Sequence, residues 1–541
     1  MKKIFPQSVE KSQKLWYNHI MTFWVAPKYR IKAKMMKIKD ILNEIDVISS
    51  YIPDAMNRRR ILSLCHNSKY ATPTCAFFCK AGALADGHLY APHAYENGAR
   101  IFIAERELDL PDDAAVIITP SSTAALNKLA VQFYNDPSKE LKIIGVTGTK
   151  GKTSIAISAY KIAISAGIKA GYIGTNGIYY NGKTFETANT TPDVLELQKA
   201  LREMANDGVS HVMLEISSQA LWQERTYGLE FDTCVFTNLF NDHIGGYEHP
   251  TFEHYRDSKK KLFTDYKIKN AVINSDGDHA AYMISGTTAE NIIATSAVGD
   301  TECSLYAQNV QRSMRGMTPG ISFELHSNNR ALADTKKVYN AFMPSPGLYS
   351  VENGLLIISI CLLLGIKLER IIKELSSLSV PGRFEAVELK SKPNSLFVID
   401  YAHNGASLKA VIDALREYEP KRIICLFGSV GGRTYGRRAE LGRVAAENAD
   451  VIIITSDNPN HEDPMNVIED IRAAVGETEK PVYMIPDRED AVIKAYELAE
   501  DGDFVLLAGK GHETYQLIMG ERVPFSERKI LDLADFEICL K

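Results

Sequence analysis

The stretch "LKIIGVTGTKGKTSIAISAYKIAISAG" (residues 141–167) decides the fold of the middle of the chain. The run "LKII" predicts a short buried strand, and "IAISAYKIAISAG" has the apolar periodicity of a helix. A Gly-rich turn between a strand and a helix directs several backbone N–H groups at one point, with the helix N-terminus behind them, and this arrangement suits a phosphate. We therefore expect Lys152 to reach the outer phosphates of a nucleotide and the Thr153 hydroxyl to bind Mg²⁺.

The spacing of this loop departs from the usual phosphate-binding pattern, which has four residues between the first Gly and Gly-Lys. Here five residues separate Gly145 from Gly151, and Val146 stands where the first Gly is expected. A Gly-rich turn with an exposed Lys is the alternative. The strand–loop–helix context favours the nucleotide site.

Length and composition describe an ordinary soluble protein. A chain of 541 residues has room for three or four domains of about 150 residues each. The net charge of −5 gives no sign of nucleic-acid binding, and no apolar run reaches the ~18 residues that membrane insertion requires. The eight cysteines are scattered, which favours a reducing, cytoplasmic location, and "CAFFC" lacks the second ligand pair of a zinc site.

Strand-like and helix-like segments alternate along most of the chain, which predicts an α/β protein with mostly parallel sheets. Breaks at "NDPSKE" and "ELSSLSVPGRFE" divide it into three domains. The predicted division is an extension of unknown role (1–35), a small N-terminal α/β domain (36–138), a central P-loop domain (139–378) and a C-terminal Rossmann-like domain (379–541). A basic amphipathic contact arm is the alternative for the extension.

Ligands of open α/β sheets bind beyond the carboxyl ends of the strands. Glu215 ends the run "HVMLE", and His243 follows "TCVFTN". Together with Thr153 they are candidate ligands of a Mg²⁺ ion that bridges phosphate oxygens. The alternatives are a surface acid for Glu215 and a structural hydrogen-bonding role for His243. The three lysines of "YRDSKKKLF" predict a solvated basic face, unless one of them turns toward the phosphates.

In the predicted C-terminal domain, the loops that follow the strands are charged, Gly-rich or contain Asn-Pro. We expect them to form a polar rim at the carboxyl ends of the strands. Their candidate functional residues are Arg383, Asp400, His403, Arg433, Asp457, Glu513 and Arg528.

Taken together, the motifs resemble the Mur ligases, the ATP-dependent ligases of peptidoglycan synthesis, from about residue 36 to residue 541. "TGTKGKTS", "EISSQAL", "FTNLFNDH", "VPGRFE", "DYAH", "DNP" and "GKGHETYQ" occur in the family's order. The closest resemblance is to the members that add the third residue of the stem peptide. It implies that ATP and Mg²⁺ drive ligation of a free amino acid to UDP-N-acetylmuramoyl-L-alanyl-D-glutamate through an acyl phosphate, in a cytoplasmic monomer.

The resemblance also implies roles for individual residues. Lys259 aligns with the family's N-carboxylated (carbamate) lysine and is expected to bind Mg²⁺ beside Thr153, Glu215 and His243. The implied catalytic residues are Lys152, Glu215, His243 and Lys259. The implied ATP-binding residues are Gly148, Thr149, Lys150, Gly151, Lys152, Thr153, Ser154, Asn353 and Arg383. The residues implied to bind the UDP-muramoyl dipeptide are Ser68, Ala83, Leu84, Ala85, Asn189, Thr190, Thr191, Ser217, Gln223 and Arg225. The remaining substrate residues, mostly in the amino-acid pocket, are His403, Arg433, Asp457, Asn458, Pro459, Asn460, Gly509 and Glu513.

One departure from the family pattern bears on substrate choice. Members that add meso-diaminopimelate resemble "DNPR", whose Arg pairs with the distal carboxylate, whereas this chain has Asn460. Loss of a bidentate Arg–carboxylate pair removes a strong recognition element. The sequence therefore predicts L-lysine as the incoming amino acid, with L-ornithine or another diamino acid next. Asp457 and Glu513 are the acids expected to receive its side-chain ammonium. Alternatives to this function are an amide ligase with another acceptor, a P-loop ATPase switch and a catalytically idle partner subunit.

Overall fold

The structure is a computed structural model that describes residues 35–82, 85–242, 244–245, 248–432 and 435–539. The predictions for Ala83, Leu84, His243, Arg433 and the 1–34 segment lie outside the described residues. The described chain forms two compact units. The first runs to Leu141 and adds residues 193–208 and 226–228, and the second holds the remainder.

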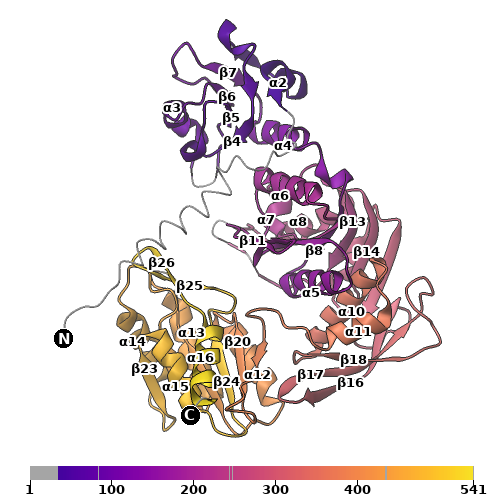
Figure 1. Cartoon of the computed structure of the whole chain (residues 1–541), viewed down its shortest axis with the longest axis vertical. Coiled ribbons are helices and arrows are strands. Elements are labelled where there is room, and N and C mark those ends of the chain that lie inside the picture. Colours follow the sequence, from indigo (N-terminus) through magenta and orange to yellow (C-terminus); the bar gives the residue numbers. More distant parts are fainter. Residues whose placement is uncertain (1–34, 83–84, 243, 246–247, 433–434, 540–541) are drawn as a thin grey trace. The chain divides into compact units, whose positions relative to one another are not determined.

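The first unit is built on a five-stranded sheet in the order β2-β7-β6-β5-β4, which is parallel except for β2 (Figure 1). Its core packs Phe78, Ile103 and Ile117 of the sheet against Leu126 and Leu129 of α4. The strands are β1 (Met36–Lys37), β2 (Ser49–Tyr51), β3 (Arg60–Ile61), β4 (Ser63–Cys65), β5 (Cys75–Phe78), β6 (Ile101–Ala104) and β7 (Ala115–Ile118). The helices are α2 (Ile38–Glu44), α3 (Ala91–Glu96), α4 (Ser122–Phe133) and α6 (Val194–Asn206).

The larger sheet of the second unit has eleven strands in the order β11-β10-β9-β12-β8-β13-β14-β15-β16-β17-β18. The strands from β9 to β16 in this order are parallel, which confirms the predicted parallel sheet. The strands are β8 (Lys142–Thr147), β9 (Ala170–Gly174), β10 (Gly177–Tyr180), β11 (Lys183–Phe185), β12 (His211–Glu215), β13 (Phe231–Phe236), β14 (Ile268–Asn274), β15 (Asn291–Ser296), β16 (Leu305–Arg315), β17 (Thr318–Ser327) and β18 (Tyr339–Met343). The helices are α5 (Lys152–Ser165), α7 (Ser218–Trp222), α8 (Phe252–Thr264), α9 (Ala280–Ile284), α10 (Leu348–Leu363) and α11 (Leu368–Leu375).

The second sheet of this unit has six strands in the order β19-β20-β24-β21-β22-β23, all parallel except β19. Its central strands are buried apolar runs, as expected when helices cover both faces. The strands, with those of a separate hairpin, are β19 (Glu385–Val387), β20 (Leu396–Asp400), β21 (Ile423–Phe427), β22 (Val451–Thr455), β23 (Val482–Ile485), β24 (Phe504–Ala508), β25 (Tyr515–Ile518) and β26 (Glu521–Pro524). The helices are α12 (Gly405–Arg416), α13 (Tyr435–Asn448), α14 (Pro464–Val475), α15 (Arg488–Leu498) and α16 (Glu527–Cys539).

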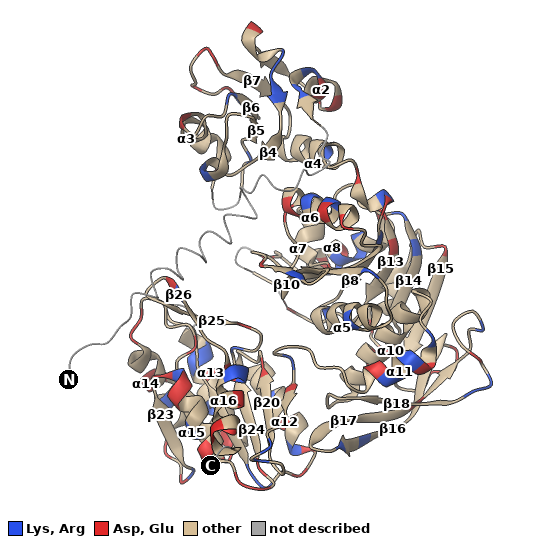
Figure 2. Cartoon of the chain, in the orientation of Figure 1, with Lys and Arg blue, Asp and Glu red and all other residues tan. Residues whose placement is uncertain are grey.

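Charges of both signs are interleaved on single helices. Figure 2 shows Lys or Arg beside Asp or Glu on α6 and on α11, for example. Among the described residues, no helix has the length and apolar character needed to cross a membrane.

Candidate active site

The loop between β8 and α5 has the backbone that the sequence predicts for phosphate binding. Gly148 has a φ of +149° and Gly151 a φ of +87°, both in the region that favours glycine. A Cβ atom on Gly148 would lie 1.9 Å from Oγ1 of Thr237. The loop therefore needs glycine at this position, both for its conformation and for its close approach to the segment after β13.

Residues of the "FTNLFNDH" motif hold this loop in place. The Thr149 amide donates to the Asn238 carbonyl and the Lys150 amide to Asn238 Oδ1, both at 2.9 Å. The Lys150 ammonium also lies 3.2 Å from Oδ2 of Asp242. The sequence did not single out Asn238, although the residue lies in a quoted motif.

Two lysines, Lys152, which is half-buried, and Lys259, which is buried, contact the same carbonyl group of the loop. Lys152 Nζ donates to the carbonyls of Gly148 and Thr149 at 2.8 and 3.0 Å, and Lys259 Nζ donates to that of Gly148 at 2.9 Å. Burial lowers the pKa of Lys152 to about 8, although Glu215 opposes the shift. Burial, and then repulsion by Lys152, lower the pKa of Lys259 well below its usual value. Lys259 therefore does not belong to a solvated basic face, whereas Lys260 is partly exposed and bonds Ser285.

Glu215 is buried at the end of β12 rather than being a surface acid. The hydroxyl of Thr153 donates to its Oε2 at 2.8 Å, Thr175 donates through both its amide and its hydroxyl at 3.1 Å, and the Tyr172 hydroxyl donates to its Oε1. Carboxylate and hydroxyl oxygens are ligands that Mg²⁺ accepts. Within the described part of the chain, no three His, Cys, Asp or Glu side chains are grouped to hold a metal.

Lys152 and Lys259 line a cavity of about 170 Å³ together with much of the predicted substrate motif. The predicted substrate residues on its wall are Asn189, Thr190, Ser217 and Arg225. The structure thus brings Lys152, Lys259 and these residues to one place.

Two other predicted substrate residues contact this motif from outside the cavity wall. Thr191 is buried, and its side chain binds the backbone at and just after the end of β12. Its hydroxyl donates to the Glu215 carbonyl and accepts from the Ser217 amide. Gln223 is exposed and accepts a 2.7 Å hydrogen bond from Arg225.

A second cavity of about 480 Å³ is lined by three of the predicted nucleotide residues, Ser154, Asn353 and Arg383. Asn353 Oδ1 lies 2.6 Å from the point where a Cβ on Gly151 would stand, so this amide closely approaches the phosphate-binding loop. The Arg383 guanidinium lies 4.9 Å from the centre of the Tyr401 ring. The cavity is large enough for a small organic ligand such as a nucleoside.

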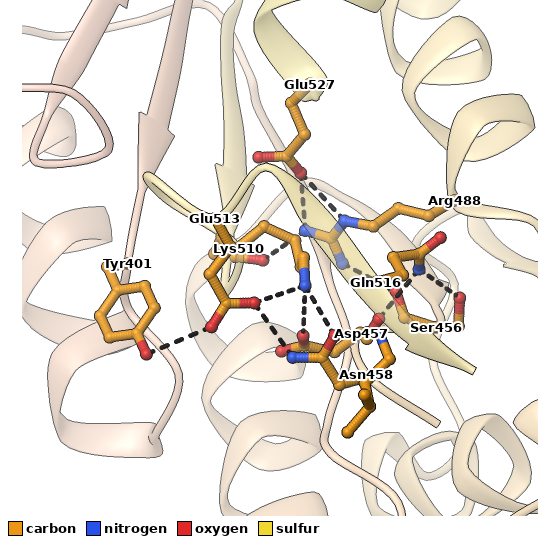
Figure 3. Close-up of polar contacts among 11 residues, drawn as sticks. Tyr401, Ser456, Asp457, Asn458, Arg488, Lys510, Glu513, Gln516 and Glu527 are labelled. Carbon is orange, nitrogen blue, oxygen red and sulfur yellow. Dashed lines mark hydrogen bonds and ion pairs between the residues drawn. The ribbon is translucent and has the colours of Figure 1, made fainter. Parts of the chain in front are cut away.

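Loops after β22 and β24 bring three of the predicted amino-acid residues, Asp457, Asn458 and Glu513, into one largely buried cluster (Figure 3). Asn458 Nδ2 donates to Glu513 Oε2 at 3.0 Å, and Lys510 Nζ contacts Asp457, Asn458 and Glu513. The acids predicted to receive a substrate ammonium are therefore already partnered by a lysine of the protein.

The other predicted residues of these loops are held mainly through the backbone. Asn460 has a φ of +55°, and its amide donates to the Leu517 carbonyl at 2.8 Å. A Cβ on Gly431 would lie 2.0 Å from the Pro459 carbonyl, so the two loops nearly touch. His403 donates from Nδ1 to the Tyr401 carbonyl at 2.8 Å, and burial lowers its pKa.

Sequence reasoning missed Lys510 and Arg488, two fully buried cations of this cluster. Lys510 had a detectable signal, because it follows a buried strand within "GKGHE". Arg488 pairs with Glu527 across 39 residues at 2.7 Å, and no local pattern indicates that pairing.

In the first unit, Ser68 begins a short 3₁₀ helix (Ser68–Tyr70), and Ala85 lies outside any helix or strand. The Ser68 hydroxyl and His93 Nδ1 are 2.9 Å apart, and Asn97 donates to the Ser68 carbonyl at 2.9 Å. The Ala85 carbonyl accepts a hydrogen bond from the Gly82 amide at 2.9 Å.

One parallel sheet ends in a glycine-rich phosphate-binding loop, and a second parallel sheet with a polar rim follows it along the chain. Together these features define an ATP-dependent ligase of the Mur type. The chain matches the family model "Mur ligase middle domain" over residues 146–361 and "Mur ligase, glutamate ligase domain" over residues 382–511. It belongs to the Mur ligase family, the ATP-dependent acid–amino-acid ligases of peptidoglycan synthesis.

Curated relatives cover nearly the whole chain. The UDP-N-acetylmuramoyl-L-alanyl-D-glutamate–2,6-diaminopimelate ligase of Clostridium botulinum is 35% identical over 481 residues, which are 88% of this chain and 95% of the relative. The enzyme of the same name from Aquifex aeolicus is 36% identical over 475 residues, 87% and 93% of the two chains. A solved structure with this enzyme name has a TM-score of 0.65 at 27% identity and covers 94% of this chain and all of its own.

These relatives overturn the prediction of L-lysine, and of L-ornithine after it, as the incoming amino acid: the relatives named above are 2,6-diaminopimelate ligases. The prediction was wrong because it assigned recognition of the distal carboxylate to position 460 alone. The Asn460 backbone pairs with β25, and β26, the other neighbour of β25, carries Arg522 opposite Leu517. A guanidinium is thus present one strand away from Asn460.

Proposed function

We propose that this protein joins 2,6-diaminopimelate to UDP-N-acetylmuramoyl-L-alanyl-D-glutamate, with hydrolysis of ATP to ADP and phosphate, as a cytoplasmic monomer. The observation that carries the proposal is the 170 Å³ cavity, in which Lys152 and Lys259 meet Asn189, Thr190 and Arg225. The names of the relatives supply the identity of the two substrates. All eight cysteines are free thiols, in keeping with a reducing compartment.

ATP binds with its phosphates on the loop from Gly148 to Ser154. Backbone amides of the loop and the N-terminus of α5 contact the phosphates, and Lys152 exchanges its carbonyl partners for phosphate oxygens. The nucleoside occupies the 480 Å³ cavity beside Asn353 and Arg383.

Thr153, Glu215 and a carbamate on Lys259 are the protein's ligands for Mg²⁺, with His243 as a further candidate. Thr153 Oγ1 and Glu215 Oε2 are 2.8 Å apart, so two hard oxygen donors already converge. When bound, the ion neutralises charge on the phosphates during transfer.

The lowered pKa of Lys259 supports its carbamate. Carbon dioxide reacts with a neutral amine, forming an N–C bond and releasing one proton, and burial favours the neutral amine. The product is an anion next to Lys152, which replaces repulsion between two cations with attraction.

The acceptor carboxylate of the UDP-linked dipeptide lies in the smaller cavity, where Arg225, Asn189 and Thr190 orient it. The carboxylate attacks the γ-phosphate, ADP leaves, and Lys152 compensates the charge on the transferred group. The amino group of the incoming residue then attacks the acyl phosphate and displaces phosphate. Ser68 and Ala85 bind the UDP portion, and the loop from Asp457 to Asn460, together with His403, Gly509 and Glu513, binds the incoming amino acid.

Phosphate release by the purified protein tests the proposal. Release should require ATP, the UDP-muramoyl dipeptide and 2,6-diaminopimelate together, and mass spectrometry should identify the UDP-muramoyl tripeptide. Phosphate release that is indifferent to both other substrates would refute the proposal, as would a requirement for a different acceptor.

A further inference from the structure

Lys510 occupies the centre of the buried cluster at the carboxyl ends of β22 and β24. Its side chain is fully buried, and Nζ lies 2.5 Å from Glu513 Oε2, 2.8 Å from Asn458 Oδ1 and 3.6 Å from Asp457 Oδ1 (Figure 3). An ammonium has three N–H donors. Three oxygens from two loops therefore surround this ammonium and hold it in one position.

The same ammonium fixes the orientation of its neighbours. Asn458 Oδ1 accepts from Lys510 and from the Leu517 amide, so Asn458 must turn its NH₂ group toward Glu513. Burial alone would raise the pKa of Glu513, but the charge of Lys510 and hydrogen bonds from Lys510 and Asn458 bring it below the usual value. Glu513 is therefore held ionised, and its Oε1 faces the Tyr401 hydroxyl at 3.4 Å.

The cluster keeps one negative charge after its internal pairing. Asp457 and Glu513 carry two negative charges and Lys510 one positive charge, while Arg488 is matched by Glu527. Gly509 lies close against Asp457, since a Cβ on Gly509 would stand in a tight contact 3.2 Å from Oδ2. The cluster thus has the net charge that one further ammonium would balance.

We propose that Lys510 is a positioning residue for the amino-acid substrate. It holds Asp457, Asn458 and Glu513 so that the two carboxylates receive the ammonium at the side-chain end of the incoming amino acid. This inference rests on the proposed function, which supplies a substrate with two amino groups.

Steady-state kinetics of Lys510→Met test the inference. Removal of a charged hydrogen-bonding group that orients two acids should raise the KM for 2,6-diaminopimelate about ten- to a hundredfold. The KM values for ATP and the UDP-linked dipeptide should stay within about twofold, because Lys510 lies outside both of their cavities. Lys421→Met is the matched control, because Lys421 forms an exposed ion pair with Glu500 in the same sheet domain and should leave all KM values unchanged.

A second substrate separates positioning from a purely structural role. With 2-aminopimelate, which lacks the side-chain ammonium, Lys510→Met should change the KM by less than about twofold. A structural role would instead lower the melting temperature and the active fraction, and would affect both amino acids equally. An unchanged KM for diaminopimelate, or an equal rise for both substrates, overturns the inference.

Lys510→Gln, which keeps a donor near Asn458, provides the same measurements if the Met variant does not fold. Absence of diaminopimelate ligation by the wild-type protein would contradict the proposed function itself. If the wild-type protein ligates diaminopimelate and Lys510→Met has the same KM for it, only the inference about Lys510 is contradicted.

Discussion

Nζ of Lys259 lies 2.9 Å from the carbonyl oxygen of Gly148, on the same group that Lys152 contacts at 2.8 Å. Two lysine side chains that converge on one carbonyl repel each other while both are charged. The repulsion, added to burial, holds the pKa of Lys259 well below its usual value. The arrangement favours a chemical change at Lys259 that removes its positive charge.

Lys259→Ala should lower the rate of ligation about a hundredfold or more, because the variant loses a ligand of the metal that supports phosphoryl transfer. Short carboxylates such as formate or acetate should partly restore the rate by occupying the vacated space. Lys260→Ala is the control, since that neighbour bonds Ser285 at the surface. A rate near that of the wild type would show that Lys259 is not the modified lysine.

ATP binding by the free enzyme should weaken as the pH rises through about 8. The pKa of Lys152 is lowered to about 8, so its phosphate-binding positive charge is present below that pH and lost above it. Loss of a single required proton predicts about a tenfold rise in the dissociation constant of ATP between pH 7 and pH 9. Isothermal titration measures this constant at each pH. Lys152→Arg should give a flat profile over the same range, and a flat profile for the wild type would contradict the assignment.

Gly148→Ala should abolish nucleotide binding and destabilise the second unit. The substitution combines a φ of +149° with a Cβ 1.9 Å from Thr237 Oγ1, and such strain costs about 1–3 kcal/mol or more. Gly167→Ala is the matched control, because Gly167 has a φ of +84° but open space around its Cβ position. The control should lower the melting temperature slightly and leave ATP binding intact. ATP binding by Gly148→Ala at wild-type affinity would show that the loop can relax.

The sequence predicted the strands that carry the site, because each is a continuous apolar run next to a loop of distinct chemistry. The run "FVLLAG", for example, is β24 with Gly509 at its end. The antiparallel strands β16 to β18 were missed, since much of β16 is exposed and has no apolar run to reveal it. Pairings across long separations were missed as well. Arg488 and Glu527 are each unremarkable locally, and only the folded chain brings them together in the core.

Position 460 shows the limit of one-residue reasoning about specificity. The absence of an Arg at that position was taken as the absence of a cation, yet recognition depends on charges in space rather than on one place in the chain. The hairpin β25–β26 carries Arg522 above the Tyr515 ring at 4.5 Å, and Lys510 Nζ lies 5.6 Å from the same ring. Arg522 and the acidic cluster therefore flank one aromatic side chain.

Arg522→Gln should raise the KM for 2,6-diaminopimelate about tenfold, because the substrate's distal carboxylate loses a guanidinium partner. The KM for ATP should not change. Arg522 also pairs with Glu186 at 2.5 Å, so Glu186→Gln, which leaves the guanidinium in place, separates loss of that ion pair from loss of substrate contact. If Arg522→Gln and Glu186→Gln shift the KM for diaminopimelate equally, the effect belongs to the ion pair, and Arg522 does not read the distal carboxylate.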